Sequence, residues 1–335
     1  MATVQIADIY NPLTFAAGVQ EAQTEKNAFI ASGVIVRDSQ LEAQMSAGGN
    51  IGEIPFFQPL GVGEPNYSTD NPGSFSTPNK IGSTKQVFRT APRNNSWSTM
   101  DLARELALQD PLGAITNRIG HYWATDDQSR VIRSCRGMLA DNIANDGGDM
   151  LFSVATDSSS AITDAERISA EVTIDGDQTL GDAQGNLVAM AVHSVIYARL
   201  RKQNLIDFLP ISDQGEKIPF YLGKRLIVDD SLPAVPGSNR ITYTSILFSA
   251  GALLIGNARV MVPSEMDRLP SAGDGGGQDV IHSRVHNCIH PNGFSFTSAS
   301  VAGQSANYGE LILAANWDRR VARKNVGIAF LNTNG

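Results

Sequence analysis

The sequence contains little of what several protein classes require. Its 335 residues include only two cysteines, Cys135 and Cys288, so the chain is no disulfide scaffold and a reducing compartment is the default. Charged residues make up 18% of the chain and the formal net charge is −8, which argues against a surface that grips nucleic acid tightly. The longest apolar run, around residues 246–255, is far too short to span a bilayer, and the first residues lack the pattern of a signal peptide. We therefore expect a folded protein with a large core, and the acidic balance still permits a container for nucleic acid.

One stretch, from Asp110 to about Asp146, has the pattern of an unusually long helix. Asp110 can cap free backbone N–H groups, Pro111 suits the first helical position, and Gly147-Gly148 can close the helix. Two apolar runs recur at helical spacing: Leu112, Ile115, Ile119 and Tyr122, then Ile132, Cys135, Leu139 and Ile143. A polar patch, Asp126-Asp127-Gln128, separates them. We expect one rod with a bend or frayed turn near Asp126; the alternative is two shorter helices that break there.

Residues 46–95 form a second unusual stretch, rich in Gly and Pro. Strand-like segments stand at its two ends, residues 51–57 and 86–90, and the residues between them, 66–79, are mostly Ser, Thr, Asn and Pro. This pattern is typical of a two-stranded ribbon with a long tip. Because such a ribbon is only marginally stable alone in water, we expect it to lie on another surface.

The remaining chain mixes short helices and strands, as an α+β protein does. Near the N-terminus, Asn11-Pro12 looks like a helix start with Phe15, Val19 and Ala22 on one face, and the apolar residues 29–36 are expected to lie on the same subunit or on a neighbour. Further helices are expected at residues 98–109, 193–202 and 309–321. Strands are expected at 150–154, 171–174, 187–192, 218–222, 224–228, 243–248 (paired with 252–255), 285–289, 294–297 and 326–331, with a turn at 175–177.

The most metal-like cluster is His282, His286, Cys288 and His290. Zinc takes His and Cys ligands, but no second ligand pair with zinc spacing occurs, so we favour a strand with polar residues on its exposed face. The sequence has no nucleophile elbow, no phosphate-binding loop and no calcium-loop spacing. Asp229-Asp230 ends a strand, and a turn explains this pair more simply than a carboxylate site. We therefore expect no catalytic, cofactor-binding or metal-binding residues.

The densest positive patch is the run from Arg319 to Lys324, which includes Arg320 and Arg323. It can contact nucleic acid phosphates, form a solvated face or meet acidic residues of a neighbouring subunit. Because the whole chain is acidic, we favour the subunit contact.

Several stretches, taken in order, resemble one family. Residues 190–201 (MAVHSVIYARLR) resemble its apolar strand, His and Tyr-x-x-Leu helix, and residues 221–233 (YLGKRLIVDDSLP) resemble its paired strands with Leu-Gly and Asp-Asp-x-x-Pro. Residues 243–256 (YTSILFSAGALLIG) resemble the buried strands that follow. The segments 290–293, 307–317 and 324–331 are similar to its C-terminal helix and strand. With the ribbon and long helix upstream, nearly the whole chain resembles the major capsid proteins of tailed bacteriophages, which have the Hong Kong 97-like fold.

The resemblance implies an α+β fold in five parts. They are an N-terminal arm (1–45), an extended β-ribbon loop (46–97), a peripheral domain with a long spine helix (98–185), an axial domain (186–280) and a return to the peripheral domain (281–335). The arm and the loop are then expected to lie on adjacent subunits, with one face of the spine helix toward the inside of the shell. The family signature begins too early for a long cleaved scaffolding region, so a scaffold is expected to be a separate protein or absent.

The implied function is self-assembly into pentamers and hexamers of an icosahedral phage head that encloses double-stranded DNA. The protein is expected in the virion, after synthesis in the host bacterial cytoplasm, with no enzymatic activity and no cofactor. Expected partners are further copies of the chain, a portal protein, scaffold and decoration proteins where these exist, and DNA through weak non-specific contacts, but no membrane. Candidate subunit-contact residues are Phe56, Phe57, Tyr67, Phe75, Lys80, Lys85, Arg89, Asp229, Asp230, Arg319 and Arg320.

The sequence leaves three points open. Some relatives join a loop lysine to a neighbour covalently, and Lys80 and Lys85 lie in that region, but no motif supports the reaction and we expect non-covalent contacts. A compartment shell of the encapsulin type, with the same fold, is the first alternative function. A zinc-dependent enzyme that uses residues 282–290 is the second.

Overall fold

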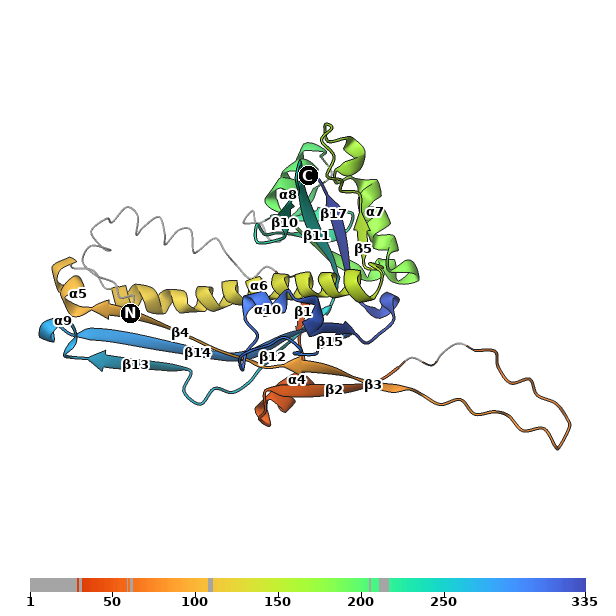
Figure 1. The fold of residues 1–335 in the computed structure, drawn as a ribbon, viewed down its shortest axis with the longest axis horizontal. Coiled ribbons are helices and arrows are strands. Elements are labelled where there is room, and N and C mark those ends of the chain that lie inside the picture. The colour runs from red at the N-terminus through yellow and green to blue at the C-terminus, as the bar shows by residue number, and fades with distance from the viewer. Residues whose placement is uncertain are drawn as a thin grey trace.

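The computed structural model describes residues 29, 32–58, 60, 63–107, 111–204, 206–210 and 217–335. Figure 1 shows a flat layer of long strands with a helix lying along it, a rounded lobe above the C-terminal part of that helix, and a loop that projects beyond the flat layer. The helix expected near Asn11-Pro12, with Phe15, Val19 and Ala22, lies outside the described residues. No helix in the described ranges is both long enough and apolar enough to cross a membrane.

Helix α6 (Pro111–Asn145) is 35 residues long and runs without a break. Its end is the expected one: Gly147 and Gly148 have φ angles of 69° and 75°, and the carbonyl of Asn142 accepts the N–H groups of Asp146 and Gly148. The single rod is confirmed, so the two-helix alternative is wrong. A frayed turn near Asp126 is also wrong, because helical structure continues through the polar patch. Asp110, the expected cap, lies outside the described residues.

The centre of the flat layer is β14 (Gln278–Pro291), a strand of 14 residues. Along one edge, β14 pairs antiparallel with the whole of β4 (Ala91–Met100). Along the other edge it pairs first with β13 (Ser264–Leu269) and then with β12 (Leu253–Asn257). The strand expected at 285–289 is therefore only the C-terminal half of a much longer one.

The N-terminal end of the described chain is built into this layer. Strand β1 (Ile35–Arg37) pairs in parallel with β12, and helix α4 (Ser39–Ser46) follows it. Phe29 is fully buried, and its ring packs edge-to-face on Phe248 at 5.7 Å between centroids. The apolar segment 29–36 therefore lies on the same subunit wherever it is described, one of the two expected outcomes.

The lobe contains a mixed sheet of eight strands in the order β5-β17-β11-β6-β9-β8-β7, with β10 paired to β11. Its strands are β5 (Leu151–Ser153), β6 (Leu187–Val192), β7 (Asp207–Pro210), β8 (Lys217–Tyr221), β9 (Lys224–Val228), β10 (Ala234–Pro236), β11 (Ile241–Ser249) and β17 (Ile328–Thr333). Helices α7 (Ala170–Gln178) and α8 (Ser194–Lys202) lie in the same lobe (Figure 1). The strands expected at 150–154, 187–192, 218–222, 224–228, 243–248 and 326–331 and the helix at 193–202 are confirmed, within a few residues at their ends.

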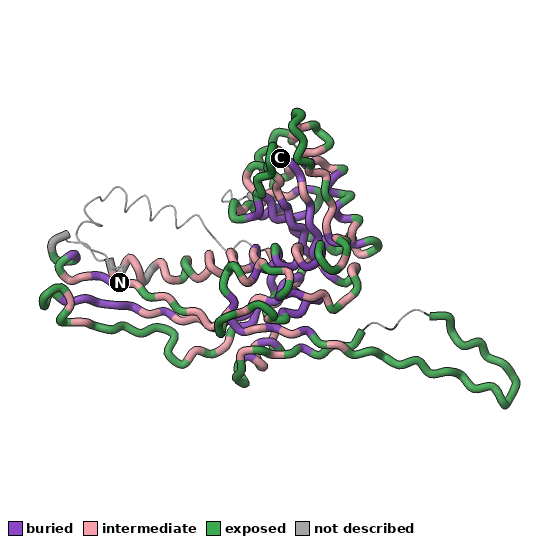
Figure 2. The backbone as a smooth tube through the Cα atoms, in the orientation of Figure 1, coloured by how far each residue is buried: buried purple, intermediate pink, exposed green. Residues whose placement is uncertain are grey.

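The central strands of the lobe are apolar on both faces because both faces are covered. Alternate residues of β6 divide between two cores: Ala189 and Ala191 join the core that contains Ile132 of α6, whereas Met190 joins the core that contains Val172 of α7. The two cores account for the purple interior of the lobe and of the region beneath it in Figure 2. The continuous apolar run at residues 187–192 therefore marks a strand that is buried between two layers at every residue except Val188.

Three expected features are wrong, and one expected helix is present but starts three residues later than expected. Residues 171–174 are no strand and 175–177 no turn, because both segments belong to α7, which Ser169 caps by accepting the N–H of Val172. The helix expected at 98–109 begins at Asp101 as α5 (Asp101–Ala107), since β4 extends to Met100. Strands β11 and β12 do not pair with each other but lie in different sheets.

The helix expected at 309–321 is mostly wrong as well. Only α10 (Tyr308–Leu311) is α-helical, and a short 3-10 helix (Ala314–Asn316) comes after it. Strand β16 (Trp317–Arg319) then pairs with β15 (Phe294–Phe296). The side-chain amide of Asn316, fully buried, donates to the carbonyls of Ser300 and Glu310 and thereby fixes the turn that ends the helix.

The five-part division of the chain stays a prediction. One expected boundary, residue 280, falls inside β14, and β17 from the expected last part pairs with β11 in the sheet of the lobe.

Candidate subunit interface

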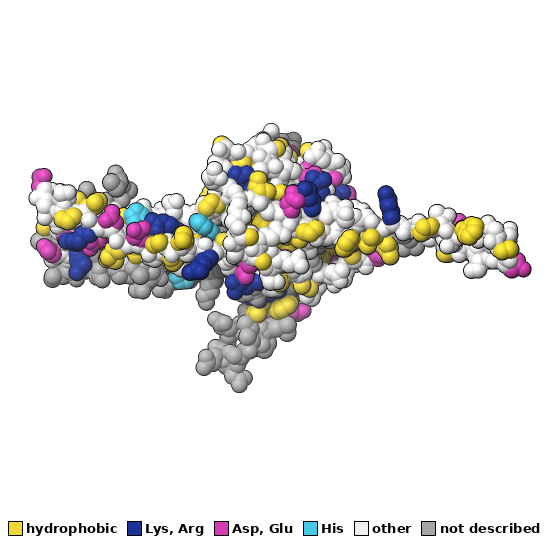
Figure 3. Space-filling view, turned by 90° about the horizontal axis from the view of Figure 1, so that it is seen from below, with side chains coloured by type: hydrophobic (Ala, Val, Ile, Leu, Met, Phe, Trp, Pro, Cys, Tyr) yellow, Lys and Arg dark blue, Asp and Glu magenta, His cyan; other side chains and the backbone are white. Residues whose placement is uncertain are grey.

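The projecting loop exposes large apolar side chains without any cover. Every described residue from 57 to 83 is exposed, and residues 63–82 form neither helix nor strand. The side chains of Phe57, Tyr67 and Phe75 are 71%, 76% and 87% exposed. Figure 2 draws the described part of this loop in green, and Figure 3 shows apolar side chains spaced along it to its tip. A segment of this kind gains stability only when another surface covers it.

The base of the loop, in contrast, is firmly attached to the flat layer. Strands β2 (Ile51–Phe57) and β3 (Ser83–Arg89) pair antiparallel over seven residues, as the ribbon pattern predicted. The hydroxyl of Ser295 accepts the N–H of Val87 at 3.1 Å, and Phe88 is buried. The base of the loop is therefore fixed to its own subunit, whereas the exposed tip projects beyond the flat layer (Figure 1).

Three of the expected contact residues lie at this base. Phe56 is half-buried, and Lys85 forms an exposed ion pair with Glu53 at 2.6 Å across the ribbon. Arg89 donates to the carbonyls of Gly303 and Gln304, so it attaches the ribbon to its own subunit. Lys80, nearer the tip, is exposed.

The two expected acidic residues, Asp229 and Asp230, follow β9 and have partners within the chain. Asp229 accepts from the N–H and hydroxyl of Ser231 and from the amide of Gln128 on α6. Asp230 accepts the N–H of Ser194 at 3.1 Å, and the hydrogen bonds from Ser194 lower the pKa of this carboxyl. The turn interpretation fits both residues, and they also join β9 to α6 and to the start of α8.

Two arginines of the basic run, Arg319 and Arg320, also have acidic partners within the subunit. Arg319 binds both carboxylate oxygens of Asp149 and lies 3.3 Å from Asp146, with its side chain largely buried. Partial burial acts to raise the pKa of Asp149, but the hydrogen bonds from Arg319 and Asn142 outweigh it and the pKa is lowered. Arg320 pairs with Asp318 at 2.7 Å. Arg319 therefore closes the end of α6 against the strand β16. Arg320 also donates to the hydroxyl of Ser295, which holds Val87 at the base of the ribbon.

The polar patch of α6 connects the helix to other elements of the same subunit. The sequence patterns did not predict this role. Asp126 and Asp127 both pair with Arg93 of β4, at a distance of 2.8 Å for Asp127, and these side chains are nearly buried. Asn287 of β14 also donates to Asp127 at 2.9 Å. The only signal in the sequence is an acidic pair within a long helix, and its partner lies more than thirty residues away.

The His and Cys residues of β14 form no metal centre. Within the described ranges, no three His, Cys, Asp or Glu side chains come together in a way that can hold a metal ion. Cys288 and His290 are buried, so the expected exposed face is wrong for them. Burial lowers the pKa of His290 to about 4 and raises that of the Cys288 thiol to about 12. The Nε2 atom of His290 lies 2.8 Å from the carbonyl oxygen of Phe294.

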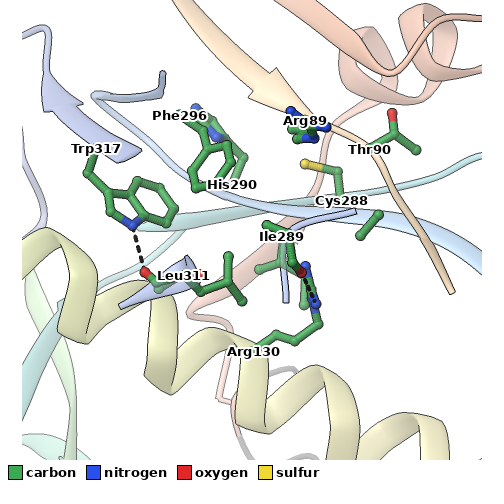
Figure 4. A pocket seen from close by; sticks show the side chains of 12 residues that line it. Arg89, Thr90, Arg130, Cys288, Ile289, His290, Phe296, Leu311 and Trp317 are labelled. Carbon is green, nitrogen blue, oxygen red and sulfur yellow. Dashed lines mark hydrogen bonds between the residues drawn. The ribbon is translucent and has the colours of Figure 1, made fainter. Parts of the chain in front are cut away.

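The enclosed space next to these residues is small. It has a volume of about 30 Å³, room for about one water molecule. Figure 4 shows Cys288 and His290 on one side of it and Arg130 of α6 on the other, where Arg130 donates to the carbonyl of Ala306 at 3.1 Å. This pocket lies where α6 packs near β14, and it is too small for a substrate.

Exposed apolar residues also occur outside the expected set. Met261, in the connection between β12 and β13, is 96% exposed, and Leu60 lies exposed on the loop. Sequence reasoning did not single them out, because isolated apolar residues in connections carry no periodic signal.

Comparisons with known proteins agree with this geometry. No protein-family model matches the chain. The major capsid protein of Bacillus phage SPP1 is 32% identical over 333 residues, which cover 98% of this chain and 97% of that protein. Among solved structures, the capsid of Ralstonia phage GP4 has a TM-score of 0.59 and 12% identity, covering 93% of this chain and 88% of the other. The capsid of cyanophage Pam1 has a TM-score of 0.54 and 10% identity, covering 90% and 89%.

The chain therefore belongs to the major capsid proteins of bacteriophages. Its fold is the Hong Kong 97-like capsid fold, and its role is that of a structural protein of the phage head shell, located in the virion. The predicted family, fold class and shell function are confirmed. The comparisons do not favour the compartment shell or the zinc enzyme.

Proposed function

We propose that the chain assembles with copies of itself into pentamers and hexamers, which close into an icosahedral shell around double-stranded DNA. The shell carries no catalytic site, and its contacts are non-covalent. A portal protein occupies one opening of the shell, and any scaffold or decoration protein is a separate chain. The packaged DNA touches the inner wall weakly, because a subunit with a net charge of −8 offers phosphates little attraction.

The observation that carries this proposal is the projecting loop. It combines a rigid base with a tip on which Tyr67 and Phe75 have no cover within the described subunit. Covering each of these aromatic side chains contributes on the order of 1.5–3 kcal/mol to association. The tip therefore lies on an adjacent subunit in the shell.

The eleven candidate contact residues divide into two groups on this basis. Phe57, Tyr67, Phe75 and Lys80 are exposed and free to meet a neighbour, so we propose that they form the contact. We propose that the others act through the subunit, by fixing the ribbon base or the ends of α6 and β9, and these residues are Phe56, Lys85, Arg89, Asp229, Asp230, Arg319 and Arg320.

Negative-stain microscopy of the purified chain tests the proposal, with nucleic-acid and protein analysis of whatever the particles contain. Closed shells tens of nanometres across that package DNA when the phage proteins are present are the expected result. A chain that stays monomeric under every assembly condition contradicts shell assembly. Shells that consistently hold a protein cargo and exclude DNA contradict the head function.

A further inference from the structure

Four carboxylates gather at the C-terminal end of α6. Asp141 lies four residues before the end of the helix, Asp146 directly follows that end, and Asp149 comes shortly after it. Asp318 belongs to β16, which packs against the helix. The last turn of α6 contains no basic residue. Because the C-terminal end of a helix carries a partial negative charge, carboxylates near it are unfavourable unless a cation or a proton offsets them.

Two arginines stand beside three of these carboxylates. Arg319 binds both oxygens of Asp149, and its Nε atom lies 3.3 Å from Asp146. Arg320 pairs with Asp318 at 2.7 Å. Each of these three carboxylates therefore has a guanidinium next to it.

Asp141 is in a different position, because it is the most buried member of the cluster, with 1% of its surface exposed. Its Oδ1 atom accepts from the side-chain amide of Asn145 at 2.6 Å, but its Oδ2 atom is buried without a hydrogen-bond partner in the described part of the chain. The Oδ2 atom of Asp146 is also buried without a hydrogen bond there. An ionised carboxylate can only accept, so a proton on one of these oxygens is what turns it into a donor.

The surroundings of Asp141 favour its neutral form. Burial raises the pKa of this carboxyl above its ordinary value, and the charges of Asp146 and Asp318 raise it further. The hydrogen bond from Asn145 and the charge of Arg319 oppose this rise without cancelling it. The resulting stabilisation is fully present below the unfolded-state pKa of about 3.9, and it is lost as the pH rises through the raised folded-state pKa.

We infer that Asp141 and Asp146 hold one proton between their buried oxygens, and that this proton stabilises the end of α6. With the proton, one carboxyl donates to the other, so both buried oxygens gain a partner. Without it, two carboxylates repel each other beside the turn at Gly147-Gly148, where the carbonyl of Asn142 accepts the N–H groups that close the helix. The end of α6 therefore loosens as the pH rises. The inference concerns the folded subunit, so it stands or falls independently of the shell proposed above.

Urea unfolding of the unassembled subunit at pH 4 and pH 7.5 tests whether Asp141 holds the proton. Asp141→Asn is neutral at both pH values, and Asp175→Asn, at an exposed position of α7, removes the same charge as a control. Relative to the wild type, the folding equilibrium constant of Asp141→Asn should rise about threefold or more from pH 4 to pH 7.5, and that of Asp175→Asn should stay constant. The dependence of His290 on pH cancels, because all three proteins contain it. A ratio for Asp141→Asn that does not change with pH overturns the inference.

Hydrogen exchange, corrected for the intrinsic pH dependence of the amides, tests where the proton acts. We expect the opening of residues 142–148 in the wild type to be about threefold or more greater at pH 7.5 than at pH 5, and to be equal at both pH values in Asp141→Asn. Residues 170–178 of α7 provide the reference and should open equally in both proteins. The same opening of residues 142–148 in the wild type at both pH values contradicts a role of the proton at the end of α6.

An Asp146→Asn background tests whether the proton is shared. An amide at position 146 carries no charge that repels ionised Asp141, so the change with pH of the Asp141→Asn ratio should fall by about half or more. Asp318→Asn is the matched background, because Asp318 also lies near Asp141 but has Arg320 as its partner, and it should reduce that change less. An undiminished change in the Asp146→Asn background overturns the sharing of the proton.

Discussion

Arg93 of β4 and Asp127 of α6 form an ion pair of 2.8 Å in which the side chains are only 10% and 14% exposed. Asp126 binds the same guanidinium, so two adjacent carboxylates of the helix share one cation from the sheet. The indole of Trp123 packs 5.4 Å from the Arg93 guanidinium, and its N–H donates to Ser283 of β14. This junction joins the long helix to strands β4 and β14 of the flat layer.

Replacement of Arg93 by Ala should strongly destabilise the unassembled subunit. Two carboxylates are then left nearly buried without their cation, and breaking a buried pair in this way costs about 3–5 kcal/mol. Arg37→Ala is the control, since Arg37 forms an exposed pair with Glu42 that is worth about 1 kcal/mol or less. Urea unfolding measures both, and equal losses in the two variants contradict a special role for the junction.

Two glycines of α6 should respond to alanine in opposite directions. Gly120 has open space where a Cβ would lie, so Gly120→Ala stabilises the helix by about 0.5–1 kcal/mol. At Gly137 a Cβ would collide with the carbonyl oxygen of Leu311 and with the indole nitrogen of Trp317, so Gly137→Ala costs about 1–3 kcal/mol despite the better helix propensity. Thermal unfolding of the two variants reports the sign, and a stabilising effect at Gly137 would show that α6 does not approach β16 so closely.

His290 should make the subunit less stable as the pH falls. Burial lowers its folded-state pKa to about 4, below the value of about 6.5 in the unfolded chain. Between these values only the unfolded state binds the proton, so the His290 contribution is present above pH 6.5 and is lost as the pH falls toward 4. Going from pH 7.5 to 5 should cost about 2 kcal/mol more in the wild type than in His290→Gln. Urea unfolding at both pH values gives the difference, and parallel losses would rule out His290 as the cause.

Phe75→Asp should abolish assembly without loss of subunit stability. The side chain contacts little within the subunit, where it is 87% exposed, so the folded monomer does not depend on it. In a subunit contact, however, a buried unpaired carboxylate is strongly unfavourable. Ser76→Ala at the same tip should assemble like the wild type. Light scattering during assembly and thermal unfolding of the monomer separate the two effects, and normal shells from Phe75→Asp would mean that this tip is not buried.

Local patterns in the sequence predicted a large part of the fold. The end of α6 at Gly147-Gly148 and the apolar run of β6 follow from backbone geometry and two-sided burial, which act within a few residues. The unbroken course of α6 past Asp126 was not predicted, because the polar patch pairs with Arg93, a partner distant in the sequence. The helix expected at 309–321 failed for a similar reason, since the buried amide of Asn316 competes for the carbonyl of Glu310.

The candidate contact residues likewise divide into those that the sequence pattern identified and those whose partners it did not. Phe57, Tyr67 and Phe75 were identifiable because a Gly- and Pro-rich stretch leaves apolar residues without a core. The internal role of Arg319 was not identifiable. A basic run has the same sequence pattern whether it contacts a neighbouring subunit or, as here, the end of α6 in its own subunit.

Hydroxyl-radical footprinting of the free subunit and of assembled shells shows whether the projecting loop becomes buried on assembly. Phe75 and Tyr67 are exposed in the subunit, and Phe330 is fully buried and serves as the unlabelled reference. We expect strong labelling of both loop aromatics in the free subunit and loss of that labelling in shells, with Phe330 unlabelled in both. Equal labelling of Phe75 and Tyr67 before and after assembly would contradict the claim that the loop holds neighbouring subunits together.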